Sequence, residues 1–270
     1  MEKYPKVAKK DYEIIKGEWE EMVKSVENGD PNAVIFIGTV TDEERTRTSA
    51  QIYNDLFEEK YRNRDDVVII DRNDVEEIIA NAVRSKNPIR NTLHSLRKLV
   101  ESYPGKKIIF SYPYFLKELG LRPDFYELET GNPTAFHEAI REKTGDDPDL
   151  GALCWFNEKD LIGLEDKNVA GADPEAVARR QLKGIMDFMR LTRLISPERQ
   201  AVRTTFGHGW NLDALATYLA KGEVNGKGFE EVLSGKIFEN ARGFDVAVEK
   251  SGELKMRCRG KEFLIPRDRL

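Results

Sequence analysis

Two short apolar runs in the first third of the chain have the pattern of strands that are buried on both faces of a parallel sheet. Ala33–Ile37 and Val67–Ile70 are continuous stretches rich in branched side chains. The segment between them, Ser49–Leu56, has the pattern of a helix. Strand, helix and strand together predict a parallel βαβ unit, which places the chain in the α/β class.

Further elements are predicted on either side of this unit. A helix with one apolar face comes first, and Asn28–Pro31 ends it. The residues of that helix expected to face the core are Ile15, Trp19, Met22 and Val26. Another long helix is predicted to begin at Pro174, with Asp173 as its N-cap. A strand is then predicted at Ala201–Phe206, followed by Gly207-His208-Gly209 and a helix that ends at Gly222.

The middle and the end of the chain have different patterns. Residues 86–160 contain a predicted helix, a predicted strand at Lys107–Phe110 and a stretch with prolines and aromatic side chains. We interpret these residues as an insertion, or cap region, within a single domain spanning residues 1–270. Near the end, Phe244–Val248 and Met256–Ile265 predict a C-terminal hairpin.

The composition narrows the classes of partner and location. The 270 residues include 43 basic and 48 acidic side chains, which give a formal net charge of −5, and 40% of them are hydrophobic. The sequence pI is near 5.5 and there is no long basic run, so nucleic acid is not expected as a partner. No segment approaches the roughly 18 apolar residues of a membrane span, and the first thirty residues are rich in charge. A cytoplasmic protein without membrane contact is therefore expected.

The cysteines and the glycine patterns give no sign of a metal or a nucleotide cofactor. Cys154 and Cys258 lie far apart and have no second ligand at metal-binding spacing, so two buried or half-buried thiols are expected. No Gly-x-Gly-x-x-Gly or Gly-x-x-x-x-Gly-Lys element follows a predicted strand. An unrelated nucleotide-binding α/β protein is therefore the least favoured interpretation.

His208 lies where the predicted strand Ala201–Phe206 meets the next helix. In parallel α/β sheets, ligands bind beyond the carboxyl ends of the strands, where helix N-termini present free N–H groups to anions. Glycines on both sides of His208 let the backbone approach a ligand. The alternative interpretation is a turn that needs glycine for its geometry and a histidine that is satisfied locally.

A second candidate segment follows the first predicted strand. Glu44–Ala50 combines basic and hydroxyl side chains at the start of a helix. The planar guanidinium of Arg45 suits a phosphate, and Thr48 or Ser49 could cap the helix or bind the same oxygens. A solvated, charged first turn is the alternative.

Together these segments resemble the histidine phosphatase superfamily, which has the phosphoglycerate-mutase-like fold. The family signature Arg-(Ala/Thr)-x-(Gln/Glu)-Thr-Ala resembles Arg45–Ala50, and its strand-end His-Gly resembles His208-Gly209. Ile15–Glu18 is similar to the family's Leu-Thr-x-x-Gly helix opening, and Gly171–Arg179 to its Gly-Glu-Ser helix. The resemblance covers nearly the whole chain except residues 86–160.

The resemblance implies a three-layer α/β/α sandwich with a mostly parallel sheet and a phosphate pocket at its carboxyl edge. It implies that a phosphoryl group is transferred from a small phosphorylated substrate through a phosphohistidine, without a metal or cofactor. Arg45 and His208 are the implied catalytic residues: Arg45 neutralises the phosphate and His208 stabilises the transition state. Thr48 and Gly209 are the further phosphate-binding residues.

A carboxylic acid is also expected, to protonate the leaving oxygen. Val75-Glu76-Glu77 resembles the family's Leu-x-Glu segment, and Glu77 is the first choice, followed by Glu76. The alternative for both is an ordinary exposed glutamate near a helix start. On this interpretation Arg45 and His208 should face a single pocket.

The sequence departs from the family at the nucleophile. No Arg-His-Gly, the motif that supplies the attacking histidine, occurs anywhere in it. Met1–Pro5 resembles the residues that follow this motif, so the chain is expected to begin after the missing strand. Ala33–Ile37 should then pair in parallel with Ala201–Phe206, or flank a gap beside it. His94 and His137 have no phosphate-type motif beside them and are expected to be ordinary helix residues.

Two functions follow from these observations. The first is a phosphomonoester hydrolase or phosphomutase whose site is incomplete in residues 1–270. The second is a non-catalytic protein that binds a phosphoester or a phosphoprotein and keeps Arg45 and His208.

Overall fold

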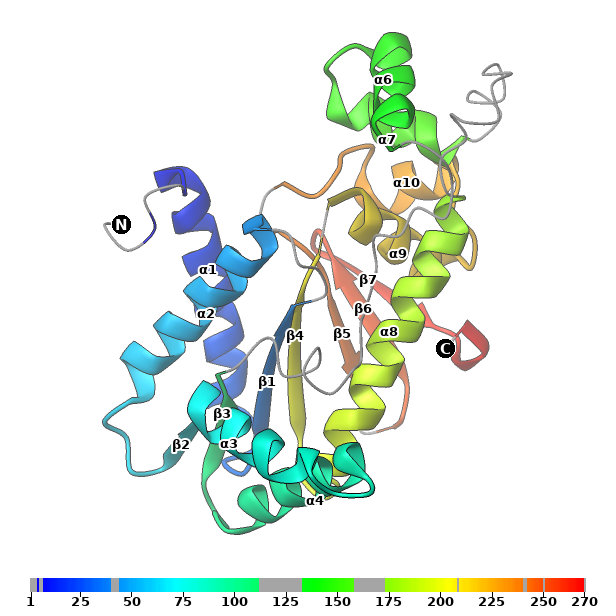
Figure 1. Ribbon diagram of the computed structural model, residues 1–270. Coiled ribbons are helices and arrows are strands. Elements are labelled where there is room, and N and C mark those ends of the chain that lie inside the picture. Colours follow the sequence, from blue (N-terminus) through cyan, green and yellow to red (C-terminus); the bar gives the residue numbers. More distant parts are fainter. Residues whose placement is uncertain are drawn as a thin grey trace. The chain divides into compact units, whose positions relative to one another are not determined.

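A computed structural model describes residue 4 and residues 7–39, 44–111, 133–157, 173–207, 209–239, 242–249 and 251–269. The chain divides into two compact units, which we describe separately. The first unit comprises Met1–Pro123 and Ile185–Gly207, and the second comprises Asp124–Gly184 and His208–Leu270. Figure 1 shows the order of the elements along the chain.

The first unit is built on a parallel sheet. Its strands are β1 (Val34–Thr39), β2 (Val67–Ile70), β3 (Lys107–Phe110) and β4 (Ala201–Phe206), in the order β2-β3-β1-β4 (Figure 1). Every pairing in this sheet is parallel. The predicted pairing of the first strand with the strand at residues 201–206 is therefore confirmed, and β4 lies directly beside β1.

One face of this sheet is covered by α1 (Lys9–Glu27) and α2 (Glu44–Tyr61). The ring of Tyr53 in α2 packs edge-on against Phe206 of β4, with 4.8 Å between ring centroids. On the same face, the Thr204 hydroxyl donates a hydrogen bond of 3.0 Å to the sulfur of Met22 in α1. Val23 of α1 is buried, whereas Met22 is only partly buried, which corrects the predicted core face at this one position.

The other face is covered by α3 (Arg72–Val83), α4 (Pro88–Glu101) and the C-terminal half of α8 (Pro174–Ile195). Phe36 of β1 is fully buried there and stacks on Phe110 of β3, with 4.8 Å between ring centroids. Phe188 of α8 packs edge-on against the ring of Phe36. Helices on both faces and a parallel sheet between them give the first unit three layers.

The predicted insertion at residues 86–160 contributes to both units. α4 and β3 belong to the first unit, and β3 pairs with both β1 and β2. Ile108, Ile109 and Phe110 have no exposed surface, so this short apolar run forms an interior strand of the sheet. The remaining described part, α6 (Pro133–Thr144) and α7 (Pro148–Phe156), belongs to the second unit.

The second unit also contains α9 (Gly209–Lys221), α10 (Gly226–Leu233) and an antiparallel sheet. The strands of this sheet are β5 (Asp245–Val248), β6 (Leu254–Cys258) and β7 (Lys261–Ile265), in that order, and a short 3₁₀ helix follows at Arg267–Arg269.

The predicted C-terminal hairpin is present as β5 and β6. The single strand predicted at residues 256–265 is wrong, because a turn divides it. Arg259 and Gly260 have positive φ values of 50° and 74°, which is the backbone of a tight two-residue hairpin turn between β6 and β7.

Replacing Phe36 by alanine should lower the free energy of unfolding by about 3–5 kcal/mol, because it leaves a cavity between β1, β3 and α8. Urea unfolding followed by circular dichroism measures this loss. Val83→Ala is a suitable control, since the Val83 side chain is 61% exposed and its loss should change stability by less than about 0.5 kcal/mol. Equal losses in the two variants would contradict the central position of Phe36.

Candidate functional site

The carboxyl ends of β1 and β4 lie side by side in the first unit. The two strands are paired in parallel over their whole length, from Val34 opposite Ala201 to Thr39 opposite Phe206. The segments that follow them along the chain are the two that the sequence marked as candidate phosphate ligands. Because strand ends of this kind are the usual ligand site of parallel sheets, this edge is the candidate site.

The first segment forms the start of α2, which begins at Glu44, five residues earlier than predicted. Thr46 is buried, and Arg47 is exposed. The Thr48 hydroxyl donates a hydrogen bond of 2.7 Å to the carbonyl oxygen of Glu44, one turn earlier in the same helix. This is the ordinary hydrogen bond of a threonine to its own helix backbone, and the role of Thr48 as a phosphate ligand stays a prediction.

Arg45 occupies the second position of α2, and the orientation of its side chain lies outside the described residues. Acidic Glu44 precedes it in the first turn, where a carboxylate is favoured by the helix dipole. The role of Arg45 stays a prediction.

The second segment leads from β4 into α9. His208 lies outside the described residues, and Gly209 is the first residue of α9. A Cβ atom built on Gly209 would lie 3.5 Å from the carbonyl oxygen of Phe238, an ordinary contact. The packing around position 209 therefore does not itself require glycine.

The expected pairing of Arg45 with His208 stays a prediction. Arg45 belongs to the first unit, whereas His208 is placed in the second and lies outside the described residues.

Glu77 and Glu76 lie on α3, which follows the edge strand β2. The side chain of Asp71 caps this helix by accepting hydrogen bonds from the N–H groups of Asn73 and Asp74. Glu77 is exposed, and Glu76 forms an ion pair of 2.6 Å with Arg72. Strands β3 and β1 separate β2 from β4, so at a spacing of about 4.8 Å per strand β2 lies about 14 Å from β4. The topology therefore does not support Glu77 as the residue that protonates a leaving group beside β4.

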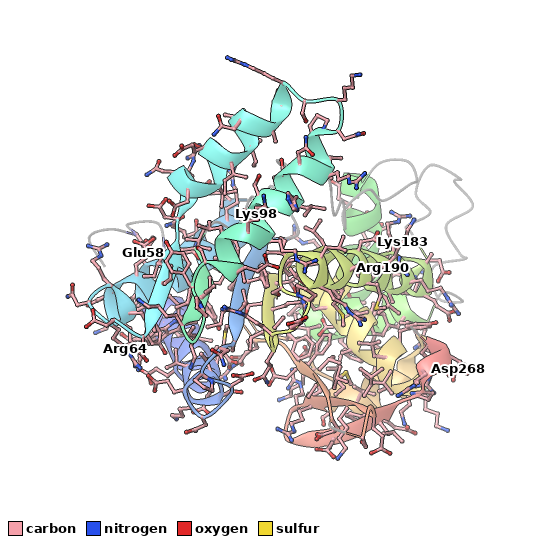
Figure 2. All side chains as sticks on the ribbon, turned by 90° about the horizontal axis from the view of Figure 1, so that it is seen from below. Glu58, Arg64, Lys98, Lys183, Arg190 and Asp268 are labelled. Carbon is pink, nitrogen blue, oxygen red and sulfur yellow. The ribbon has the colours of Figure 1, made fainter. Side chains whose placement is uncertain are left out.

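A carboxylate that the sequence analysis did not select contacts the residue that follows β3. Ser111 immediately follows β3, the neighbour of β1, and its buried hydroxyl donates a hydrogen bond of 3.0 Å to the carboxylate of Glu58 in α2. Figure 2 shows Glu58 among the side chains of the first unit. Glu58 also pairs with Arg62 one turn later, at 3.3 Å. A polar residue directly after an apolar run, such as Ser111 after Lys107–Phe110, is the sequence signal that could have identified this pair.

The other two histidines occupy helices, as predicted. His94 is exposed on α4. His137 lies in α6, and its side chain is outside the described residues.

Asp213 of α9 is the most strongly perturbed carboxyl group in the described part of the second unit. It has no exposed surface, and its Oδ1 accepts a hydrogen bond of 2.9 Å from the N–H of Phe238. Among the described residues, Oδ2 has no hydrogen-bond partner. Burial raises the pKa of Asp213 to about 8, although the nearby charge of Arg259 opposes the shift and that of Asp149 adds to it. A carboxyl group this deeply buried holds the backbone of Phe238 and is not accessible to a substrate.

The cysteines agree with the prediction, since Cys154 and Cys258 are both buried and neither forms a disulfide. Burial raises the pKa of the Cys258 thiol to about 11. Within the described ranges, no group of three His, Cys, Asp or Glu side chains is placed to hold a metal ion. A search of the helices in those ranges found none that is both long and apolar enough to span a membrane.

Comparison with known proteins gave no match: no family model, no curated protein and no solved structure is significantly similar to the chain.

Asp213 should make the protein less stable as the pH rises. Its folded pKa, about 8, lies above the unfolded value of 3.8, so between these values the folded state keeps a proton that the unfolded state has lost. Stability then falls with pH by up to about 1.4 kcal/mol per unit from this group alone. Asp213→Asn keeps an acceptor for the N–H of Phe238 but cannot ionise.

We therefore expect the melting temperature of Asp213→Asn to rise relative to the unchanged protein between pH 5 and pH 8. Asp213→Leu is the matched control, because it also cannot ionise but leaves the N–H of Phe238 without its acceptor, and it should be less stable than Asp213→Asn at every pH. If the melting temperatures of Asp213→Asn and the unchanged protein varied with pH in the same way, Asp213 would not be neutral in the folded state.

Proposed function

We propose that this chain binds phosphomonoesters in a site of the histidine phosphatase type at the carboxyl ends of β1 and β4. One observation carries the proposal: β1 and β4 are adjacent, parallel and in register to their last residues, Thr39 and Phe206. The two segments with phosphate-binding chemistry thus leave the sheet from neighbouring strand ends. The proposal assigns a guanidinium and a helix N-terminus to one anion, because both favour negative charge.

The residues have separate roles in this proposal. Arg45 neutralises the phosphate charge with its fork of N–H donors. The N–H groups at the start of α9, beginning at Gly209, bind the same oxygens. His208 donates a hydrogen bond to the equatorial oxygens as negative charge develops on them. The Thr48 hydroxyl, which donates a hydrogen bond to the carbonyl oxygen of Glu44, would have to rotate to bind the phosphate.

Chemistry at this site would need an attacking group. Transfer through a phosphohistidine requires a nucleophilic imidazole, and His208 is assigned to stabilising charge instead. No Arg-His-Gly occurs in the 270 residues. This observation favours a second candidate function, in which the site binds a phosphoester or phosphoprotein without turning it over.

Binding of inorganic phosphate, vanadate or tungstate tests the site. Isothermal titration should show binding to the unchanged protein that weakens about tenfold or more in Arg45→Ala, because a charge-assisted contact to the anion is lost. Arg47→Ala is the matched control: Arg47 is exposed, lies two residues further along the same helix and should be dispensable. Binding that survives Arg45→Ala unchanged would leave the proposed site without support.

Hydrolysis of p-nitrophenyl phosphate separates the two candidate functions. We expect residues 1–270 to hydrolyse it very slowly or not at all, because the covalent route lacks its nucleophile. Anion binding without turnover would support the binding function. Robust turnover that is lost in His208→Ala would instead favour the hydrolase.

A further inference from the structure

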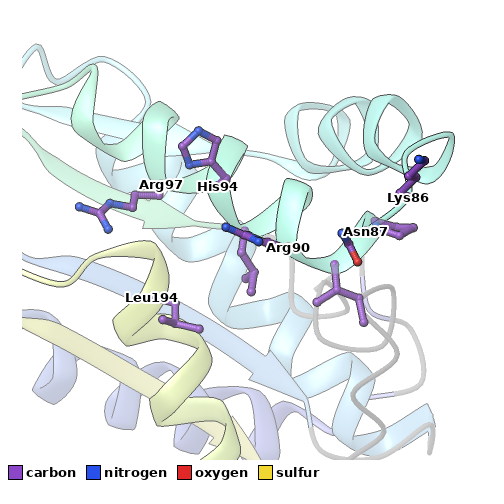
Figure 3. A pocket seen from close by; sticks show the side chains of 9 residues that line it. Lys86, Asn87, Arg90, His94, Arg97 and Leu194 are labelled. Carbon is purple, nitrogen blue, oxygen red and sulfur yellow. The ribbon is translucent and has the colours of Figure 1, made fainter.

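We propose that a groove between α4 and the C-terminal half of α8 is a docking site for an acidic, amphipathic helix of another protein. The groove belongs entirely to the first unit and has a volume of about 590 Å³. It combines exposed aliphatic side chains with cationic groups, as Figure 3 shows for Arg90, Arg97 and Leu194.

The apolar part of the groove is exposed to an unusual degree. Ile89 of α4 and Leu194 of α8 are 55% and 58% exposed, and both line the groove. Leu93 of α4 is partly buried against the hydrophobic core and contributes a third aliphatic side chain to the groove. Exposed aliphatic side chains with polar groups around them are the feature that an amphipathic helix recognises.

The charge around these side chains has one sign. From Ile78 to Val100 the sequence contains five Lys or Arg residues and no Asp or Glu, although the whole chain carries a net charge of −5. Of these cations, Lys86, Arg90 and Arg97 line the groove. In the part of the chain that the structure describes, Arg97 pairs with Glu101 at 2.8 Å, whereas neither Lys86 nor Arg90 forms an ion pair.

The same polarity continues at both ends of the groove. α4 begins at Pro88 without a side-chain cap and has no acidic residue in its first turn, so its N-terminal dipole is uncompensated there. Two further cations that do not line the groove lie on the same helices, Lys98 on α4 and Arg190 on α8 (Figure 2), and Arg190 pairs with Asp187 at 3.3 Å. Complementary charge of this kind selects an acidic partner and accelerates its association.

The lining also favours a protein partner over a nucleic acid. No Phe, Tyr or Trp is among the residues that line the groove, so it offers no broad aromatic surface for stacking bases. Ile89, Leu93 and Leu194 are suited to leucine side chains spaced three and four residues apart on a helix, with Glu side chains on the flanks reaching Lys86 and Arg90.

A designed peptide tests this inference. The probe is a fluorescent 18-residue helix with Leu along one face and Glu elsewhere, and fluorescence anisotropy measures its binding to the full chain. We expect affinity that falls as salt rises, and a loss of about tenfold or more in both Arg90→Glu and Leu194→Ser. A scrambled peptide of identical composition should bind at least tenfold more weakly, because it has no continuous apolar face.

The control variants carry the same chemical changes elsewhere. Leu264→Ser replaces a leucine that is also 58% exposed, on β7, and Arg62→Glu reverses an exposed cation immediately after α2. Both should change the affinity less than twofold, and circular dichroism should show all four variants folded.

Several results would overturn the proposal. Peptide binding that is absent, or insensitive to Leu194→Ser, would remove the helix as the occupant. Tighter, Leu194-independent binding of a single-stranded RNA oligonucleotide or of phosphatidylserine vesicles would assign the cations to those ligands. Self-association in analytical ultracentrifugation that Arg90→Glu abolishes would assign the groove to a second copy of the chain.

Discussion

β1 is hydrogen-bonded on both edges and covered on both faces, and the organisation of the first unit depends on this double constraint. β3 and β4 pair with its two edges, and Val34 to Ile37 have no exposed surface. If the register of such a strand shifted by one residue, each of its buried side chains would move to the other face of the sheet and meet the helices that cover that face. The level at which β1 ends, beside Phe206 of β4, is therefore fixed, and so is the edge at which a ligand could bind.

The sheet could be predicted from the sequence because its signals are local and strong. Ile108, Ile109 and Phe110, like the runs in β1 and β2, are apolar at consecutive positions, which only a strand covered on both faces accommodates easily. Their order in the sheet is not a local property, so the position of β3 between β2 and β1 did not follow from the sequence. The turn at Arg259 was missed because arginine is not a typical turn residue, and nothing in the sequence shows that its φ is 50°.

The candidate site was predicted in part, and for a similar reason. A basic helix start and a glycine-flanked histidine after two strands are visible in the sequence, and the parallel pairing of those strands brings their ends together. The carboxylates were harder to assign, because Glu77 and Glu58 both lie on helices that follow strands of the sheet. Only the strand order shows that β2 is remote from β4, and only the fold shows that Glu58 contacts Ser111.

The buried Asp213 also affects how the protein exchanges protons with its surroundings. With a pKa of about 8, this carboxyl group is largely protonated at pH 7, so the folded chain carries about one negative charge fewer than the formal count of −5. When the chain unfolds at neutral pH, the group returns to its ordinary pKa and releases its proton to the buffer. The heat of unfolding at neutral pH should therefore include the ionisation heat of the buffer that accepts this proton, and should differ between buffers with different ionisation heats.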